Sequence, residues 1–301
     1  MATFAIGDFE ELRVAAERSP RSVPAAQALL KHIRMAKMRE SEMVVRHGSK
    51  LVERQAALGD EYWSVLEQVF LAALDVDERS LAQTCLQALN EQFPESTRVK
   101  RLVGISREAM GKYAEAEEIY KGMLEENPAN QLVLKRQVCV LKAQNKIPAA
   151  IKCLNNYLKQ FQADANAWQE LADLYLSVSK YEAAAFCYEE LVLANPTSHI
   201  NHCRLGEIYY TLGGKHIAKA RKYFAQSLEL KKTNNARALH GLAACCHANT
   251  TFKDRNVRAD VTAALHEYAS EELAKLYSEQ SPTLLPKVEA ILETQRAAIE
   301  K

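Results

Sequence analysis

A spacing of 34 residues recurs through the middle of this 301-residue chain and narrows the folds open to it. Alanines stand 34 residues apart, at Ala82, Ala116, Ala150 and Ala184. Larger side chains follow them in two further columns, Leu86, Tyr120, Leu154 and Tyr188, then Leu89, Met123, Tyr157 and Leu191. Prolines keep the same phase at Pro94, Pro128 and Pro196. Columns in register predict a stack of like units, each of which buries its apolar face against the next.

One copy carries the whole signature of a tetratricopeptide repeat, which is a helix A, a turn and a helix B. Its signature residues are Trp168, Leu171, Ala172, Tyr175, Ala184, Tyr188, Leu191 and Pro196. Small residues on helix A, such as Gly104, Ala172 and Gly206, are expected where two helices cross closely. Proline lacks an N–H and ends helix B. We therefore expect an all-α fold, a right-handed superhelical solenoid of tetratricopeptide helix pairs with flanking capping helices.

The repeats divide the chain into three expected segments. Five full copies run from about residue 63 to about residue 232, and a sixth begins with a helix that contains Asn235, Leu239 and Gly241. An array exposes apolar surface at both ends, so flanking caps are expected. The predicted division is an N-terminal helical arm or cap at 1–62, the repeat array at 63–250 and C-terminal capping helices at 251–301.

Helices are also expected outside the array. Before it, two helices are predicted at 24–46 and 49–58, separated by His47 and Gly48, after a weakly ordered segment of roughly 20 residues. After it, the pattern predicts helices at 254–278 and 282–300.

Charge and hydropathy argue against several classes of function. The chain has 39 Lys and Arg against 38 Asp and Glu, so it lacks the basic excess that nucleic-acid binding usually needs. No stretch reaches the ~18 uninterrupted apolar residues of a transmembrane helix, and the first residues do not resemble a secretory signal. Seven cysteines without paired spacing predict reduced thiols in the cytosol.

No motif in the sequence predicts catalysis or a bound cofactor. Nucleophile elbows, Walker loops, dinucleotide-binding glycines and zinc-protease motifs are all missing. Cys85, Cys153 and Cys187 share one repeat phase and are expected in the core, with a redox role as the alternative. Two His/Cys groups do not match a standard zinc spacing, and they comprise His199, His202, Cys203, His240, Cys245, Cys246 and His247. We expect a protein that is not an enzyme and that holds no metal or cofactor.

The exposed face of the A helices is the candidate binding site. Repeat phase assigns nine residues to the concave groove: Arg98, Arg101, Lys135, Lys142, Asn166, Gln169, Asp173, Glu207 and Tyr210. The first four are basic and the rest are polar to acidic, so the groove is predicted to grip an extended or helical partner segment whose acidic groups meet the basic half. The alternative is a charged face that only contacts solvent.

Some tetratricopeptide proteins clamp the terminal carboxylate of a chaperone. That clamp needs Lys and Asn on the first helix A, Asn on the second, and Lys and Arg on the third. Lys135 fits, but the remaining positions, Cys139, Glu170, Ile200 and Arg204, supply only one more partial match. A register starting at residue 63 already fails at Glu67 and Leu71. The sequence therefore argues against a carboxylate-clamp co-chaperone.

Four stretches are more specific than the repeat signature requires. They read LGDEYWSVLEQVFLAALD (58–75), FPESTRVKRLVG (93–104), AAAFCYEELVLANP (183–196) and ARKYFAQSLELKKTNNARALHGL (220–242). These stretches resemble the family of subunit 2 of the ER membrane protein complex. The resemblance runs from about residue 40 to about residue 250.

The resemblance implies a non-catalytic scaffold on the cytosolic face of the ER membrane, peripheral and without a membrane span of its own. Its partners would be the membrane-embedded and cytosolic subunits of the complex, and its groove would embrace a cytosolic helical segment of a membrane subunit. The complex would insert tail-anchored and multipass transmembrane segments into the ER. The alternative is a free cytosolic tetratricopeptide adaptor or co-chaperone.

Overall fold

The helix starts recur with the repeat because the capping residues recur. Asn130, Asp164 and Ser198 stand 34 residues apart, and each accepts a hydrogen bond through its side chain from the backbone N–H three residues later, over 3.2–3.4 Å. Such caps satisfy an amide that the first helical turn leaves without a partner. Each of these residues therefore fixes the start of one helix A.

The turns inside the pairs recur in the same way. Positive φ angles of 60°, 73°, 57°, 57° and 66° are found at Asp77, Gly111, Asn145, Ser179 and Gly213, respectively. A left-handed residue at this point ends helix A and turns the chain back. Three of these five residues, Asp77, Asn145 and Ser179, are not Gly, so the turns do not require glycine and the sequence gives only a weak signal for them.

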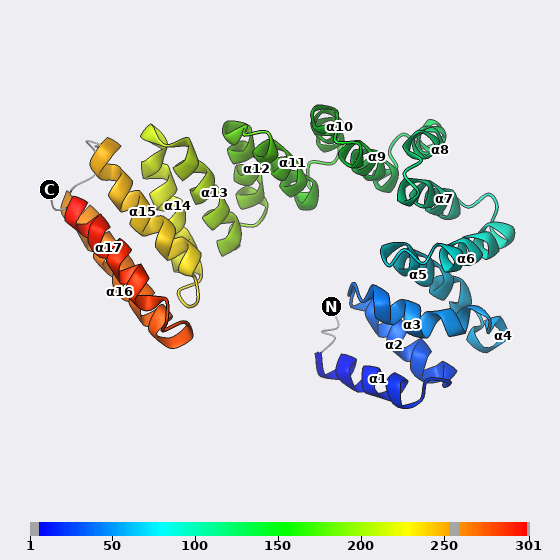
Figure 1. Cartoon of the computed structure of the whole chain (residues 1–301). Helices are drawn as coiled ribbons and strands as arrows, with labels where there is room; N and C mark the ends of the chain where they lie inside the picture. The colour runs from blue at the N-terminus through cyan, green and yellow to red at the C-terminus, as the bar shows by residue number, and fades with distance from the viewer. Residues whose placement is uncertain (1–5, 253–258, 300–301) are drawn as a thin grey trace. The chain divides into compact units, whose positions relative to one another are not determined.

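The computed structural model describes residues 6–252 and 259–299, and every regular element in these ranges is helical (Figure 1). Two compact units divide the chain, Met1–Asn145 and Lys146–Lys301, and each is described by itself. The all-α tetratricopeptide fold is confirmed. The division at residues 62 and 250 into arm, array and cap stays a prediction.

The N-terminal unit holds nine of the described helices. They are α1 (Ile6–Arg18), α2 (Val23–Met35), α3 (Ser41–Val52), α4 (Gln55–Leu58), α5 (Glu61–Asp75), α6 (Arg79–Gln92), α7 (Thr97–Ala109), α8 (Tyr113–Glu126) and α9 (Gln131–Ala143). Successive helices pack as antiparallel neighbours, α5 on α6 and α7 on α8, while α3 lies against α5. Leu29, Leu30, Leu66 and Phe70 are fully buried between them.

The C-terminal unit continues with further helix pairs. They are α10 (Ile147–Gln160), α11 (Ala165–Ser177), α12 (Tyr181–Ala194), α13 (His199–Leu212), the short 3₁₀ helix η1 (Gly214–His216), α14 (Ile217–Leu230), α15 (Ala236–Phe252), α16 (Ala259–Gln280) and α17 (Leu285–Ile299). The pairs α11–α12 and α13–α14 are repeats, and α15 packs against α14, α16 and α17.

The small residues at the helix crossings confirm the expected packing. A Cβ atom on Gly104 of α7 would lie 2.4 Å from the Tyr120 ring of α8, and one on Gly206 of α13 would lie 3.0 Å from the Phe224 ring of α14. Ala172, on α11, is fully buried. The aromatic column of helix B therefore packs directly on the backbone of helix A. The prolines also act as expected, since Pro94, Pro128 and Pro196 each follow the end of a helix B.

The predicted helices before the array were wrong in their break point. His47 and Gly48 do not separate two helices, because both lie inside α3. A Cβ on Gly48 would lie 2.4 Å from Cγ2 of Val69, so this glycine permits α3 to approach α5 closely. The break falls instead at residues 36–40, where Lys37 has a φ of 55°.

At the chain ends, the structure revises the expectation for the N-terminal segment and agrees with the two helices expected after the array. The segment expected to be weakly ordered contains the helix α1, which packs on α2 and buries Phe9 and Ala16. After the array, α16 and α17 correspond to the two predicted helices. The predicted residues 254–258 and 300 lie outside the described ranges.

Candidate functional site

Two predicted groove residues of the N-terminal unit form ion pairs between neighbouring A helices. Arg98 and Arg101 lie on α7, and both reach Glu67 of α5, with N–O distances of 2.5 Å and 3.8 Å. The Glu67 side chain is only 14% exposed, whereas that of Arg98 is 67% exposed. A single carboxylate therefore faces two guanidinium groups, and the surface keeps an excess of positive charge.

A cavity of about 350 Å³ opens beside these arginines. Its lining residues are Thr97, Arg98, Arg101, Met123, Asn130 and Leu132. Leu132, at the start of α9, is 57% exposed, and the buried Nε atom of Arg101 has no hydrogen-bond acceptor. A buried donor without an acceptor is costly. The cavity therefore offers cationic donors and an apolar contact to a segment that carries an acidic and an apolar side chain.

The other two predicted basic residues lie further along α9. Lys135 is half-buried and Lys142 is exposed, and neither lines that cavity. Arg136 lies between these two lysines in the sequence, and the repeat phase did not select it. Arg136 pairs with Glu108 of α7 through two nitrogens, with Nε 2.9 Å from Oε1.

Glu108 also joins the core of the α7–α8 pair. Its carboxylate accepts a hydrogen bond from the Tyr120 hydroxyl as well as those from Arg136. Burial, with the hydrogen bond to Glu108, raises the pKa of Tyr120, so the hydroxyl stays a donor at neutral pH. The contacts among Glu108, Tyr120 and Arg136 connect α7, α8 and α9, and they hold α9, which carries Lys135, against the α7–α8 pair.

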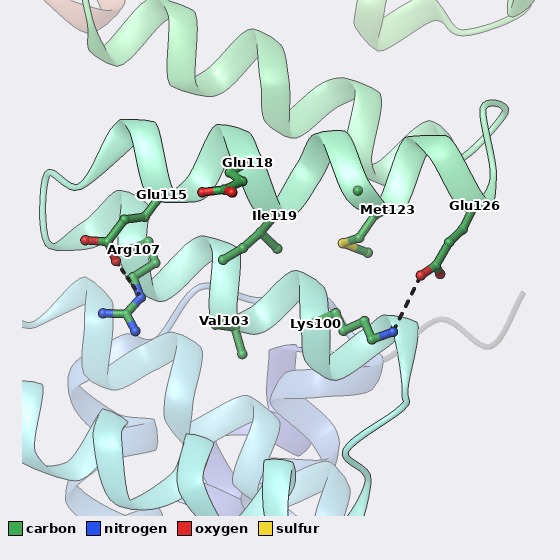
Figure 2. A pocket seen from close by; sticks show the side chains of 9 residues that line it. Lys100, Val103, Arg107, Glu115, Glu118, Ile119, Met123 and Glu126 are labelled. Atoms are coloured by element: carbon green, nitrogen blue, oxygen red, sulfur yellow. Dashed lines mark ion pairs between the residues drawn. The ribbon is translucent and has the colours of Figure 1, made fainter.

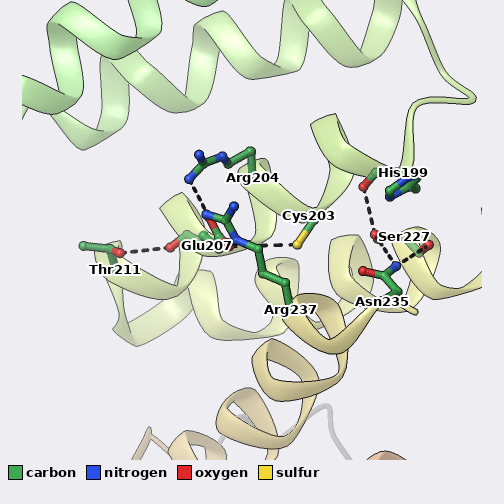
Figure 3. Close-up of polar contacts among 8 residues, drawn as sticks. All are labelled: His199, Cys203, Arg204, Glu207, Thr211, Ser227, Asn235 and Arg237. Atoms are coloured by element: carbon green, nitrogen blue, oxygen red, sulfur yellow. Dashed lines mark hydrogen bonds and ion pairs between the residues drawn. The ribbon is translucent and has the colours of Figure 1, made fainter. Parts of the chain in front are cut away.

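In the C-terminal unit, the predicted polar residues differ in their surroundings. Asn166, Gln169 and Asp173 are exposed on α11, and Tyr210 is exposed on α13. Glu207 of α13 is instead paired with Arg237 of α15 through two nitrogens, and with Arg204 at 3.3 Å (Figure 3). Asp173 is therefore the acidic member of this set that is more accessible to a partner.

The same region fixes the start of α15 through buried polar contacts. The Asn235 side-chain nitrogen lies 3.2 Å from the carbonyl oxygens of Ser227 and Lys231, and 3.2 Å from the Ser227 hydroxyl. Ser227 in turn donates to the His199 carbonyl over 2.8 Å (Figure 3). Buried polar side chains with full sets of partners specify one packing.

Pairs at the repeat spacing were missed because each copy was interpreted separately. Residues 34 apart occupy equivalent positions on neighbouring repeats, and several such pairs touch: Gln27–Glu61, Arg34–Gln68, Ser41–Asp75 and Glu67–Arg101. A search for complementary side chains 34 residues apart would have found these contacts. It would also have extended the repeat to α2 and α3.

Of the three cysteines expected in the core, Cys85 and Cys187 are buried and Cys153 is half-buried. Burial raises the pKa of Cys85 to about 11 and that of Cys187 to about 12, which leaves both thiols protonated. His202 lies 2.9 Å from the Pro196 carbonyl, and His240 lies 3.1 Å from the Tyr277 hydroxyl. Within these residues, no three His, Cys, Asp or Glu side chains are grouped to hold a metal ion.

Comparison with solved structures agrees with the fold. The C-terminal part of a TPR repeat-containing protein from Cytophaga hutchinsonii matches with a TM-score of 0.56. The match covers 87% of this chain and 98% of that one, at 12% sequence identity. This likeness concerns the tetratricopeptide architecture alone.

Comparison of sequences is more specific. The family model described as "EMC2 TPR-like repeat domain" matches residues 81–231. ER membrane protein complex subunit 2-A of Xenopus laevis is 42% identical over 265 residues, which cover 85% of this chain and 89% of the relative. The TPR repeat protein oca3 of Schizosaccharomyces pombe is 36% identical over 64% of this chain and 71% of its own length. The chain therefore belongs to the family of ER membrane protein complex subunit 2.

Proposed function

We propose that this protein is a scaffold subunit of the ER membrane protein complex that holds membrane-embedded and cytosolic subunits together. In this role it supplies binding surface and geometry, and the assembled complex inserts tail-anchored and multipass transmembrane segments into the ER. The chain works as a peripheral component at the cytosolic face of the membrane.

Family membership and fold support the general part of this proposal. The relatives are named as subunits of an ER membrane complex, and proteins with this repeat fold are non-catalytic interaction scaffolds. Among the described residues, none of the helices is both long enough and apolar enough to cross a bilayer. A scaffold of this kind is held at a membrane by its partners.

The specific part of the proposal rests on the cavity beside Arg98, Arg101 and Leu132, which we call the α7–α9 cavity. Arg98 and Arg101 outnumber their carboxylate, the Arg101 Nε atom is buried without an acceptor, and Leu132 is exposed beside them. A partner segment with an acidic side chain next to an apolar one satisfies the donor and covers the leucine. The site is therefore proposed to grip such a segment of another subunit.

Substitution of Leu132 tests this assignment. Leu132→Glu places a carboxylate beside Arg98 and Arg101, where it competes with the acidic group of the partner. Because Leu132 is exposed, the variant is expected to fold normally. We expect recovery of the other subunits with the tagged protein to fall about tenfold, which corresponds to ~1.4 kcal/mol of binding.

Leu193→Glu is the matched control, since Leu193 of α12 is 73% exposed and far along the chain from the cavity. Recovery equal to that of the unsubstituted protein is expected for this control. Unchanged recovery with Leu132→Glu would remove the cavity from the binding surface. A free cytosolic adaptor or co-chaperone would bring down no membrane subunits in any of the three cases.

A further inference from the structure

A second groove lies between α7 and α8, and it shares Met123 with the α7–α9 cavity but is otherwise lined by different residues. It has a volume of about 490 Å³, and Val103, Ile119 and Met123 provide its apolar side chains. Figure 2 shows an ion pair at each end, Lys100–Glu126 at 3.7 Å and Arg107–Glu115 at 3.3 Å. Such a site has an apolar centre between two charged ends, which suits an apolar side chain with polar neighbours.

The equivalent face of the C-terminal unit is filled by the chain's own side chains. Counting from the helix starts, Val103 of α7 corresponds to Leu205 of α13, and Arg107 corresponds to Tyr209. Leu205 is fully buried and Tyr209 is 5% exposed. The position of Ile119 on α8 is taken by Tyr223 on α14, whose ring stacks on that of Tyr209 with centroids 5.7 Å apart.

One of these two tyrosines, Tyr209, also contacts the preceding repeat. Tyr209 donates a hydrogen bond to Glu189 of α12, and Lys219 lies 5.3 Å from the Tyr209 ring centroid. At the corresponding place in the N-terminal unit, Gln87 replaces the acceptor Glu189 and Arg107 replaces the donor Tyr209. A cavity of about 210 Å³ remains there between α6 and α7, lined in part by Gln87, Val103 and Arg107. The N-terminal unit thus lacks the aromatic filling that its own repeat motif accepts.

Gly122 keeps the floor of the groove open. It lies in the interior of α8, and a Cβ atom added to it would meet nothing within 4 Å. A helical glycine is destabilising relative to alanine, and the packing within this chain gives it no compensating close contact. The corresponding residue of α14 is Gln226. A side chain from another molecule that packs closely on α8 at this position explains why a glycine stands there.

The charges around the groove indicate the chemistry of the occupant. Three carboxylates and two cations line it, and the surplus carboxylate is that of the exposed Glu118. In the filled C-terminal site, Lys219 accompanies the tyrosine pair. A cation beside an aromatic ring therefore complements Glu118 at the open site.

We propose that the α7–α8 groove docks a helix from another subunit of the complex, and that this helix presents a tyrosine or phenylalanine with a lysine or arginine beside it. The aromatic ring packs over Val103, Ile119 and Gly122, and the cation pairs with Glu118. This assignment rests on the proposed scaffold function and names the chemistry of one of its partners.

Binding of a designed peptide to the purified full chain tests the groove directly. The probe is an alanine-based helical peptide of about 16 residues, long enough to form a helix, with two tyrosines one turn apart and a lysine beside each. Gly122→Phe fills the groove from the α8 side, where the space is empty. Gln226→Phe is the matched control at the same position of α14, and its side chain is exposed.

The peptide is expected to bind the unsubstituted chain and Gln226→Phe equally, and to bind Gly122→Phe at least about tenfold more weakly. Exchange of the peptide lysines for glutamate is expected to weaken binding to the unsubstituted chain, and Glu118→Lys is expected to reverse that preference. No binding, or equal binding to Gly122→Phe, overturns the assignment. Thermal melting of each variant establishes that it is folded.

Purification of the complex separates this inference from the proposed function. If the tagged unsubstituted chain and Gln226→Phe recover the other subunits and Gly122→Phe loses at least one of them, both hold. Full recovery with Gly122→Phe overturns the groove assignment and leaves the scaffold function standing. Failure of the unsubstituted chain to recover any subunit overturns the scaffold function itself.

Discussion

At the residue scale, two glycines in one helix pair have opposite roles. Gly104 lies against the Tyr120 ring, so any side chain there must displace an aromatic residue of the core. Gly122 faces open space in the same pair. The difference shows that the glycine of the repeat signature is a packing residue, whereas Gly122 has no packing role within the chain.

Gly104→Leu is expected to lower the free energy of unfolding by about 1–3 kcal/mol, because the leucine overpacks the α7–α8 crossing. Gly122→Ala is the control, and it is expected to raise the same quantity by about 0.5–1 kcal/mol, because alanine favours the helix. Urea denaturation followed by circular dichroism measures both. An unchanged midpoint for Gly104→Leu would contradict the packing assigned to this residue.

His47, which lies inside α3, adds a pH dependence at the same scale. Burial, assisted by Lys50 and Arg46, lowers the pKa of His47 below its ordinary value of 6.5. The unfolded chain therefore takes up a proton that the folded chain does not, once the pH falls below about 6.5. Protonation of His47 therefore has no effect on the free energy of unfolding well above pH 6.5. It lowers this free energy as the pH falls from about 6.5 toward the pKa of His47 in the folded state.

Unfolding free energies at pH 7.5 and pH 5.5 are expected to differ less for His47→Gln than for the unsubstituted chain. Glutamine removes the titrating group and keeps a polar side chain of similar size. Measurement of both proteins by urea denaturation at the two pH values gives the comparison. An identical difference for the two proteins would show that His47 does not contribute to the pH dependence.

At the scale of elements, neighbouring A helices are connected by ion pairs that share one arrangement but differ in exposure. Glu108–Arg136 connects α7 to α9, with side chains 10% and 30% exposed. Glu207–Arg237 connects α13 to α15, with side chains 29% and 54% exposed. Solvent weakens the second pair more than the first, and removal of one partner from a buried pair leaves an uncompensated charge.

A pair of double-mutant cycles tests this contrast. The coupling energy between Glu207 and Arg237 is expected to be about 0.2–1 kcal/mol, as for partly exposed pairs. The coupling between Glu108 and Arg136 is expected to be larger, because Tyr120 also depends on Glu108. Denaturation of the single and double alanine variants gives both values. A stronger coupling at Glu207–Arg237 would contradict the role assigned to burial.

The repeat period predicted most helices of the array but fewer of the contacts between them. Capping residues, crossing residues and prolines all have local physical causes, so they are visible in the sequence. Gly48 was misinterpreted as a helix break because a glycine at a close helix contact and a glycine at a helix end look alike without the structure. Glu67, Arg136 and Arg237 were missed as partners because their pairing depends on how side chains of successive repeats meet.

At the scale of the whole molecule, each unit presents a surface that its own packing does not satisfy. In the N-terminal unit the α7–α9 cavity offers the unpartnered Nε donor of Arg101, and the α7–α8 groove offers an apolar centre with a spare carboxylate. In the C-terminal unit, Asp173 and Tyr210 are exposed on the A helices. Such surfaces are typical of a subunit whose repeats bind segments of other chains.

The measurement that tests the central claim most directly is affinity purification of the tagged full-length protein from ER membranes extracted in mild detergent, with the co-purifying chains identified and their amounts compared. The scaffold account predicts a stoichiometric set of membrane-embedded and cytosolic subunits that stays bound when the salt concentration is raised, because apolar contacts accompany the ion pairs. Recovery of chaperones alone, or of no partner, would contradict the account and favour a free tetratricopeptide adaptor.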